Sequence, residues 1–286
     1  MRRGLSRLWI KLTSPFRRFH AFFSDEPEER PFSETLTDTV KSPSLLMEHI
    51  EAFRKHLFRA LIVTALLVVV AFKFTNAIMA IFARPIGGMD NLQAIQVTEN
   101  LGVFMRIGFF TGLAFAIPYI AFELYLFAAP GLSVRARRYG LVGIPFAALF
   151  FFGGIAFAYF FMLPTALPFL LNFGGIPAHP TANSYYGFIT NILFWIGLAF
   201  EFPLVIFVLS AMGLVKPGML LSQWRLAIVV IAVAAAMITP TVDPVNMALV
   251  MAPMIVLYFF SIVLSSIAQA GRRKNVKQGD LSGDEA

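Results

Sequence analysis

The segment Gly197-Leu-Ala-Phe-Glu-Phe-Pro203 is the most informative in this sequence, because it places a carboxylate inside a long apolar stretch, Tyr186–Met212. A stretch of that length spans a bilayer as a helix. A carboxylate near the centre of such a helix costs about 2.5–3.5 kcal/mol on insertion scales. Because such a residue is rarely left facing lipid, Glu201 is predicted to face a polar cavity or a partner.

The composition indicates a protein embedded in a membrane. Of 286 residues, 58% are hydrophobic and only 14% are charged, whereas soluble proteins average about 25% charged residues. The net charge is +7, but the basic residues flank apolar segments, which favours membrane topology over nucleic-acid binding. We therefore expect a polytopic membrane protein with no nucleic-acid partner.

The sequence offers little for catalysis. It has no cysteine, which excludes disulfides and thiolate chemistry. Its four histidines show no metal-binding spacing, and there is no glycine-rich phosphate loop. We therefore expect no catalytic residue, no metal and no cofactor.

Six apolar segments predict an all-α protein with six transmembrane helices. All Lys and Arg residues except Lys73, Arg84 and Arg106 lie on one side of these segments. By the positive-inside rule, both termini are then cytoplasmic. The expected spans are Leu57–Phe72, Leu101–Ala128, Tyr139–Leu163, Tyr186–Met212, Leu226–Ile238 and Val245–Ile267.

The regions outside the spans differ in composition. Residues 1–23 are basic and aromatic, as in amphipathic arms that lie on anionic membrane surfaces. Residues 24–44 have the composition of an acidic flexible linker. A specific partner site in this arm is the alternative, and no cleavable signal peptide is expected. We expect a cytoplasmic region 1–44, a six-span membrane domain 45–268 and a polar cytoplasmic tail 269–286.

Two of the spans are irregular. The first is expected to continue past Lys73 as an amphipathic helix to about Phe82. The fifth, at 13 residues, gives only about 20 Å of helix against a hydrocarbon core of about 30 Å. Either the bilayer thins there or another protein covers this edge. The alternative is a longer helix that extends back through Trp224 and Leu220-Leu221.

Three charged residues inside the spans are candidate intramembrane polar groups. Arg106 lies near the outer end of the second span, where it either reaches the headgroups or serves a site. Glu123 lies about one turn from the cytoplasmic end of that span, and either pairs with a nearby base or contributes to function. Glu201 lies deepest and is assigned to function.

A proton relay through Glu201 finds little support, because the third, fifth and sixth spans contain no Asp, Glu or His. There is also no internal repeat, which argues against a transporter built from inverted repeats. A small-solute transporter is therefore the weaker alternative. A polar patch in a wet groove fits better, because it needs only one or two such groups.

A series of short motifs resembles the TatC family, subunits of the twin-arginine protein translocase. The resemblance covers residues 47–268 and keeps the family's order along the chain. The motifs are His49-x-x-x-Phe53-Arg54, Thr98-Glu99 with Arg106, Phe127-Ala-Ala-Pro-Gly-Leu132 with Arg137-Arg138, Ala156-Phe-Ala-Tyr159 with Pro164, Gly197-x-x-Phe-Glu-x-Pro203 and Thr239-Pro-Thr-Val-Asp-Pro244.

The resemblance implies a concave, glove-shaped bundle in the cytoplasmic membrane of a prokaryote. Such a protein binds signal peptides that carry paired arginines. It assembles as a homo- or hetero-oligomer with single-span partner subunits of the TatA and TatB type. Folded proteins then cross the membrane, driven by the proton-motive force, and the subunit itself is not an enzyme.

The sequence departs from the family where paired arginines would be recognised. Ala52 and Ala136 occupy the two positions at which the family carries acids. Glu48, Glu51 or Glu123 is a candidate substitute, because paired guanidiniums need carboxylates. The alternative is a TatC-like paralogue or scaffold that assembles without recognising twin arginines directly.

The resemblance assigns the remaining site residues to two surfaces. In the hairpin between the last two spans, Met247 stands where the family often has Gln. The expected signal-peptide surface comprises Glu48, Glu51, Arg54, Phe127, Arg137 and Arg138, and the expected partner-docking edge comprises Thr239, Asp243 and Asn246.

Overall fold

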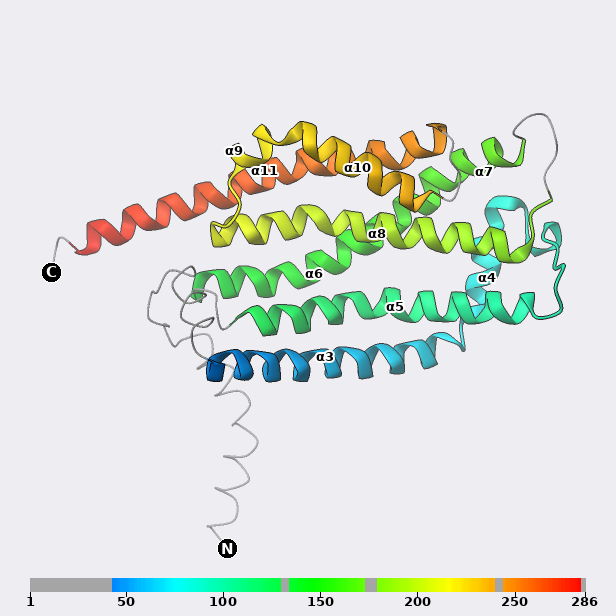
Figure 1. Cartoon of the computed structure of the whole chain (residues 1–286), viewed down its shortest axis with the longest axis horizontal. Coiled ribbons are helices and arrows are strands. Elements are labelled where there is room, and N and C mark those ends of the chain that lie inside the picture. The colour runs from blue at the N-terminus through cyan, green and yellow to red at the C-terminus, as the bar shows by residue number, and fades with distance from the viewer. Residues whose placement is uncertain (1–42, 130–133, 173–178, 240–243, 284–286) are drawn as a thin grey trace, which may run out of the picture.

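The computed structural model describes residues 43–129, 134–172, 179–239 and 244–283, and these residues form a bundle of helices (Figure 1). Each of the six expected segments is helical where it is described. Within the described residues, four helices are long and apolar enough to cross a membrane, one bent pair passes the same test together, and a shorter apolar helix covers Trp224–Ile238. The predicted all-α membrane fold is confirmed.

The first expected span is a bent pair of helices. Helix α3 covers Pro43–Ala71, and after a short turn that contains the exposed Lys73 the chain continues as α4, Thr75–Ala83. The two helices meet at 73°. The chain is thus helical to about Phe82, as expected, but α4 crosses under the bundle instead of extending α3 (Figure 1). Short 3₁₀ turns follow at Arg84–Ile86 (η1) and Met89–Asn91 (η2).

Three tyrosines fix the end of α4. The hydroxyl of Tyr159 donates to Ile81 O at 2.6 Å, that of Tyr185 to Phe82 O at 2.9 Å, and that of Tyr186 to Met79 O at 2.9 Å. Carbonyls in the last turn of a helix lack intrahelical donors and need other partners. The tyrosines therefore satisfy and anchor a helix end that packs inside the bundle.

Helix α5, Glu99–Ala128, packs closely along α3. A Cβ atom at Gly112 would overlap the backbone and side chain of Val68, and one at Gly108 would lie 2.5 Å from the ring of Phe72. Small residues spaced four apart allow two helices to approach to backbone contact. The spacing of Gly108 and Gly112 thus sets the α3–α5 distance.

The third span is a composite helix. Helix α6 covers Val134–Phe157, a π-helical segment covers Ala158–Met162 (η4), and α7 covers Leu163–Leu171. It therefore runs eight residues past the expected end at Leu163. Short π segments inside α-helices commonly change the direction of the helix or the phase of its faces.

Helix α8, Ala182–Met212, is central because it packs against α5, α6 and α11. Its N-terminus is capped by Thr181, whose Oγ1 accepts from Ser184 N. Gly154 of α6 and Gly197 of α8 face each other, and a Cβ on Gly154 would lie 2.9 Å from Gly197 Cα. The glycine of the Gly197–Pro203 motif is thus a point of close helix approach.

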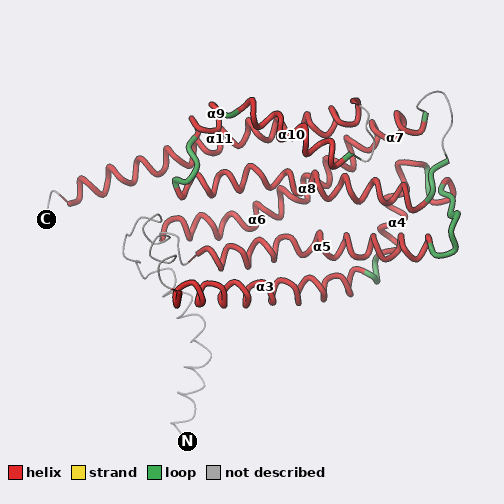
Figure 2. The backbone as a smooth tube through the Cα atoms, in the orientation of Figure 1, coloured by secondary structure: helices red, strands yellow, loops and turns green. Residues whose placement is uncertain are grey.

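The last two spans pair as α10, Trp224–Ile238, and α11, Pro244–Gly283. Helix α9, Pro217–Ser222, is separate from α10 and ends at Gln223. The alternative of a longer fifth helix is therefore confirmed as far as Trp224, where α10 begins, and wrong for Leu220-Leu221, which lie in α9. Helix α10 has 15 residues, about 22 Å of helix, so the expected shortness is confirmed. Figure 2 shows that helices make up most of the described chain.

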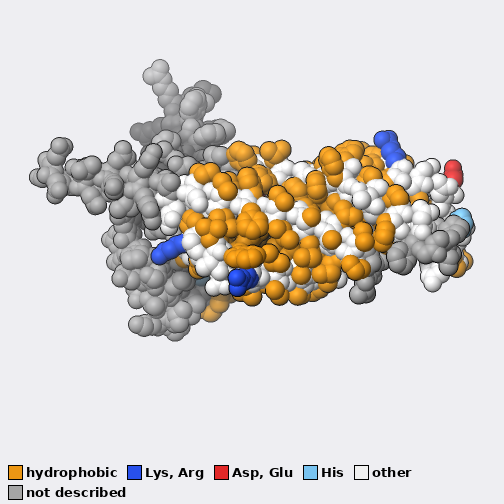
Figure 3. Space-filling model, turned by 90° about the horizontal axis from the view of Figure 1, so that it is seen from above, with side chains coloured by type: hydrophobic (Ala, Val, Ile, Leu, Met, Phe, Trp, Pro, Cys, Tyr) orange, Lys and Arg blue, Asp and Glu red, His pale blue; other side chains and the backbone are white. Residues whose placement is uncertain are grey.

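The outer surface of the bundle is apolar. Figure 3 shows hydrophobic side chains over the middle of the molecule and charged side chains toward its two ends. The exposed apolar residues of α3 and α10 include Leu61, Leu66, Val69, Val230 and Val233. Between charged ends, such a surface suits lipid as its solvent.

Candidate functional site

The candidate residues fall at the two ends of the bundle and in its middle. At the end called here the His49 end, α3 begins, α5 ends, α6 begins and α8 ends (Figure 1). At the opposite end, called the Arg106 end, α5 and α8 begin and α10 ends (Figure 1).

Phe127 is the centre of an aromatic cluster at the His49 end. Its ring centroid lies 5.4 Å from that of Phe53 and 6.3 Å from those of His49 and His56, all in edge-on geometry. The three partners recur at positions i, i+4 and i+7, so they share one face of α3. The cluster joins the first turns of α3 to the last turn of α5, and Phe53 is 42% exposed.

Glu123 is buried next to this cluster and holds two hydrogen-bond partners. His56 Nδ1 lies 2.6 Å from Glu123 Oε2, and the Tyr119 hydroxyl donates to Glu123 Oε1 at 2.6 Å. Glu123 is only 3% exposed. The reading in which Glu123 pairs with a nearby base is confirmed, and that base is His56. A carboxylate held in this way reaches an incoming guanidinium only if His56 moves away.

Ala52 lies on the face of α3 that carries His49, Phe53 and His56, because positions 49, 52, 53 and 56 follow helical spacing. Its methyl group is partly buried. Glu51 is on another face, where it is exposed and forms an ion pair with Lys55 at 2.9 Å. Arg54 is exposed as well. Glu51 is therefore an accessible carboxylate beside the aromatic cluster, but it does not occupy the position of Ala52.

Several expected site residues are not described at the level of side chains. Glu48 lies in α3, and Ala136, Arg137 and Arg138 lie in the first turn of α6. Asp243 lies outside the described residues. These assignments remain predictions.

Glu201 lies in α8, one turn beyond Gly197, and is partly buried. Its Oε1 atom is buried and has no hydrogen-bond partner among the described residues. Pro203, two residues on, is fully buried, and Gly197 packs against Phe151 and Ile155 of α6. Glu201 is thus held in a rigid α6–α8 contact while part of its carboxylate is left without a protein donor.

Glu99 and Arg106 converge on one residue at the Arg106 end. Glu99 Oε1 accepts from Asn183 N at 2.7 Å, which caps the first turn of α8 from α5. Its Oε2 accepts from Ile95 N at 2.9 Å and Gln96 N at 3.3 Å. Arg106 Nη1 donates to Asn183 O at 3.1 Å. Glu99 therefore caps the N-terminus of α8, and Arg106 is hydrogen-bonded to α8 through the Asn183 carbonyl.

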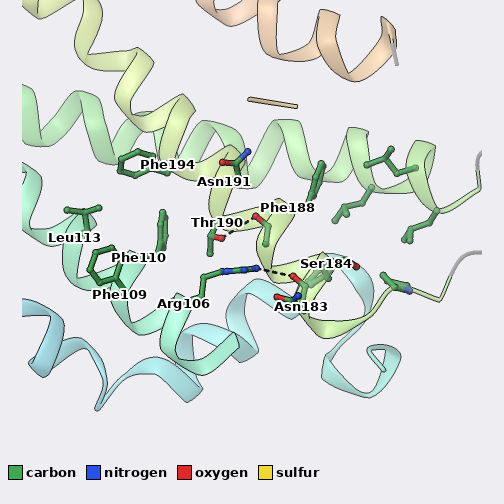
Figure 4. A pocket seen from close by; sticks show the side chains of 16 residues that line it. Arg106, Phe109, Phe110, Leu113, Asn183, Ser184, Phe188, Thr190, Asn191 and Phe194 are labelled. Atoms are coloured by element: carbon green, nitrogen blue, oxygen red, sulfur yellow. Dashed lines mark hydrogen bonds between the residues drawn. The ribbon is translucent and has the colours of Figure 1, made fainter. Parts of the chain in front are cut away.

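An open groove of about 880 Å³ runs from Arg106 between α5, α7 and α8 (Figure 4). Arg106, Asn183 and Ser184 lie at the end of the groove nearest the start of α8. Thr190 and Asn191 line it deeper, where Thr190 donates to Tyr186 O and Asn191 donates to Ile238 O. The other deeper residues are apolar and include Phe109, Phe110, Leu113, Phe188 and Phe194.

The expected docking edge lies where α10 ends. Thr239 is 6% exposed, and its hydroxyl donates to Ala235 O at 2.9 Å. Asn246, at the start of α11, is 2% exposed. Asn191 of α8 donates to Ile238 O at 2.6 Å and accepts from Trp195 Nε1 at 3.1 Å. Thr239 and Asn246 therefore face the bundle, and Asn191 fastens the end of α10 to α8.

Sequence reasoning missed the residues that complete these arrangements. His56 and Asn191 each bond to a residue on another helix, and Tyr119 bonds to Glu123, four residues further along α5. One usable signal was the i, i+7 spacing of His49 and His56 on α3. In the described parts of the chain, no group of three or more His, Cys, Asp or Glu residues could hold a metal ion.

Comparisons with known proteins agree with this geometry. Residues 48–253 match the family model described as Sec-independent protein translocase protein (TatC). The chain is 32% identical over 250 residues to the TatC protein of Deinococcus radiodurans, covering 84% of this chain and 92% of that protein. It is 31% identical over 245 residues to the TatC protein of Carboxydothermus hydrogenoformans, covering 85% and 98%.

The structure is also similar to a solved one. A crystal structure of the twin arginine translocase receptor TatC superposes with a TM-score of 0.69 at 30% identity, over 77% of this chain and 99% of that chain. The TatC-like helical fold expected from the sequence is therefore confirmed.

Proposed function

Because this chain belongs to the TatC family of Sec-independent protein translocase proteins, we propose that it is the signal-peptide-binding core subunit of a twin-arginine translocase. The family is one of protein-transport components, so the chain is a membrane transport protein and not an enzyme. In this proposal it assembles with single-span partner subunits, and folded cargo crosses by the proton-motive force. It lies in the cytoplasmic membrane of a prokaryote with both termini cytoplasmic.

The observation that carries this proposal is the match to nearly the whole of a twin arginine translocase receptor. The chain covers 99% of that receptor structure, so no span of the receptor lacks a counterpart. The His49 end, with its exposed Phe53 and Phe127 cluster, is then the surface offered to a signal peptide.

Recognition of paired arginines proceeds here without acids at positions 52 and 136. Glu51 is exposed, and its present partner Lys55 is equally exposed. A guanidinium makes two parallel bonds to a carboxylate where an ammonium acts as a point charge, so a signal arginine displaces Lys55. The edge of the Phe127 cluster offers ring faces on which the second guanidinium stacks. Glu48, one turn before Ala52, adds a second carboxylate, and Arg54, Arg137 and Arg138 shape the surrounding surface.

Glu201 is the polar contact for the signal peptide or a partner helix within the membrane. An intramembrane carboxylate with one oxygen buried and lacking a donor gains free energy when a helix brings one. A partner subunit docks at the edge marked by Thr239, Asp243 and Asn246; because Thr239 and Asn246 are buried and face the bundle, they shape this edge rather than contact the partner. Helix α10 is short there, and a neighbouring helix relieves the mismatch with the bilayer.

A second candidate function is a TatC-like scaffold that assembles but leaves recognition to another subunit. Ala52 and Ala136 favour it, because the two positions that would carry acids hold methyl groups.

Complementation of a strain lacking its own TatC separates these functions. Export of a folded twin-arginine reporter by the unmodified chain supports direct recognition, whereas export that requires Ala52→Glu with Ala136→Glu supports the scaffold. A crosslinkable twin-arginine peptide should label residues 48–54 of the purified protein, and the matched twin-lysine peptide should not. Equal labelling by both peptides contradicts recognition through Glu48 and Glu51.

A further inference from the structure

We propose that the groove at the Arg106 end is a binding site for one anionic phospholipid, with the headgroup phosphate on Arg106 and an acyl chain along the apolar wall. The groove, described above, lies between α5, α7 and α8 (Figure 4). Its volume of about 880 Å³ is within the range of about 300–1,000 Å³ in which ligand sites fall.

Arg106 is exposed, and its guanidinium is directed along the groove toward Asn183 at the start of α8 (Figure 4). Its Nη1 donates to Asn183 O at 3.1 Å, and the guanidinium lies against Gly187, where a Cβ atom would be 2.5 Å from Nη1. An arginine that merely snorkelled would have no need of this contact with α8. The glycine therefore makes room for a positioned cation.

The charge of Arg106 is not neutralised by the described protein. Among the described residues, no carboxylate lies within 4.0 Å of its guanidinium. The nearby Glu99 is occupied by backbone N–H groups of Asn183, Ile95 and Gln96. A guanidinium has five N–H donors, and one of those on Arg106 is used by Asn183. The remaining donors match the oxygens of a phosphate, which guanidinium binds in bidentate geometry.

The groove carries its charge at one end and is mostly apolar beyond it, in the same order as a membrane lipid. Arg106 lies at the end of the bundle, Leu113 and Phe194 lie deeper, and the donors of Thr190 and Asn191 between them are used by protein carbonyls (Figure 4). Leu113 is about 10 Å deeper than Arg106 along α5. A lipid in the leaflet at this end places its phosphate outermost and its acyl chain inward, in the same order. A free anion would leave the apolar wall uncovered, and a lipid without a phosphate or an apolar peptide would leave Arg106 without a counter-ion.

Native mass spectrometry of the full chain in detergent tests this site. The protein is titrated with phosphatidylglycerol and, separately, with diacylglycerol of identical acyl chains, which lacks the phosphate. We expect one phosphatidylglycerol to be retained with about tenfold higher affinity than diacylglycerol, because a hydrogen-bonded charge contact is worth roughly that factor. Equal retention of the two lipids by the unmodified chain overturns the proposal.

Two variants, Arg106→Gln and Leu113→Trp, locate the site, and Arg84→Gln is the control. Arg106→Gln should lose the preference for phosphatidylglycerol, whereas Arg84→Gln, which removes an exposed arginine of η1 outside the groove lining, should keep it. Leu113→Trp keeps Arg106 but fills the groove, and should lower retention of both lipids. Full retention by Arg106→Gln, or equal loss in Arg84→Gln, contradicts the site.

Helix content by circular dichroism controls for folding. If Arg106→Gln does not fold, Leu113→Trp and the comparison of the two lipids on the unmodified chain decide the matter. Stoichiometric displacement of phosphatidylglycerol by an apolar signal peptide would assign the groove to peptide instead of lipid.

Discussion

Glu123 and Glu201 are both carboxylates within membrane-spanning helices, and the protein holds them in opposite ways. Glu123 is 3% exposed and has partners at 2.6 Å on both oxygens. Glu201 is partly buried, and its Oε1 has no hydrogen-bond partner among the described residues. A buried polar group is stabilising only when its partners are in place. The contrast indicates that Glu123 holds α3 to α5, whereas Glu201 leaves one oxygen without a donor, the oxygen that the function proposed above assigns to a signal peptide or partner helix.

The contrast between Glu123 and Glu201 is tested most directly by substituting Glu123. Glu123→Ala should lower the free energy of unfolding in detergent by about 3 kcal/mol, the lower end of the range for breaking a buried pair, because His56 keeps some contact with solvent. Leu124→Ala, at an exposed neighbouring position, is the matched control and should change stability far less. Equal losses in the two variants would show that Glu123 contributes no more than a lipid-facing side chain.

The second test disrupts the packing of α3 against α5, the two helices that carry His56 and Glu123. Gly112→Leu places a side chain on the backbone of Val68, and overpacking of this kind costs about 1–3 kcal/mol. Gly102→Leu is the control, since a Cβ atom there has open space. Thermal unfolding should show a lower midpoint for Gly112→Leu only. A midpoint equal to that of the unmodified chain would mean that α3 and α5 separate without cost.

Substitution of Glu201 should affect export more than stability, the opposite of what is expected for Glu123. Glu201→Gln replaces a carboxyl group whose Oε1 lacks a protein donor, so stability should stay within about 1 kcal/mol of the unmodified chain or rise. Export of a folded reporter should nevertheless fall, because the contact proposed for the signal peptide or a partner helix is weakened. A loss of stability as large as that of Glu123→Ala, or loss of membrane insertion, would remove the distinction between the two carboxylates.

The smallest effect is expected at the surface of α3. Lys55→Ala should leave thermal unfolding unchanged, because exposed ion pairs contribute little. It should raise affinity for a twin-arginine peptide about twofold to threefold at low salt, since Glu51 loses its competitor, and the gain should shrink as salt screens the charges. Unchanged affinity at every salt concentration would remove Glu51 from the recognition surface.

The sequence predicted the features that depend on hydropathy and length. The apolar segments became helices and the fifth is short. Of the two readings that the sequence left open for Glu123, pairing with a base is the one observed. The partner of Glu123 could not be named, because contact between His56 and Glu123 depends on the rotation of α3 against α5. That rotation is fixed by Gly108 and Gly112, whose roles follow from what lies opposite them.

Contacts between residues far apart in the chain could not be predicted from the sequence either. Glu99 accepts from the backbone N–H of Asn183, 84 residues later, and no local sequence pattern predicts such a contact. The 73° bend after Ala71 was missed because the apolar pattern continues through it. The position of the site residues relative to one another thus required the packed structure.

The tyrosines that anchor α4 have a consequence for biosynthesis. The carbonyl of Phe82 receives its side-chain donor from Tyr185, 103 residues further along the chain, and that of Ile81 from Tyr159, 78 residues further. A ribosome makes these residues in order, so α4 leaves the exit tunnel well before its anchors exist. We therefore expect the first two helices to enter the membrane as a loosely packed pair and to adopt their final angle only when α8 arrives.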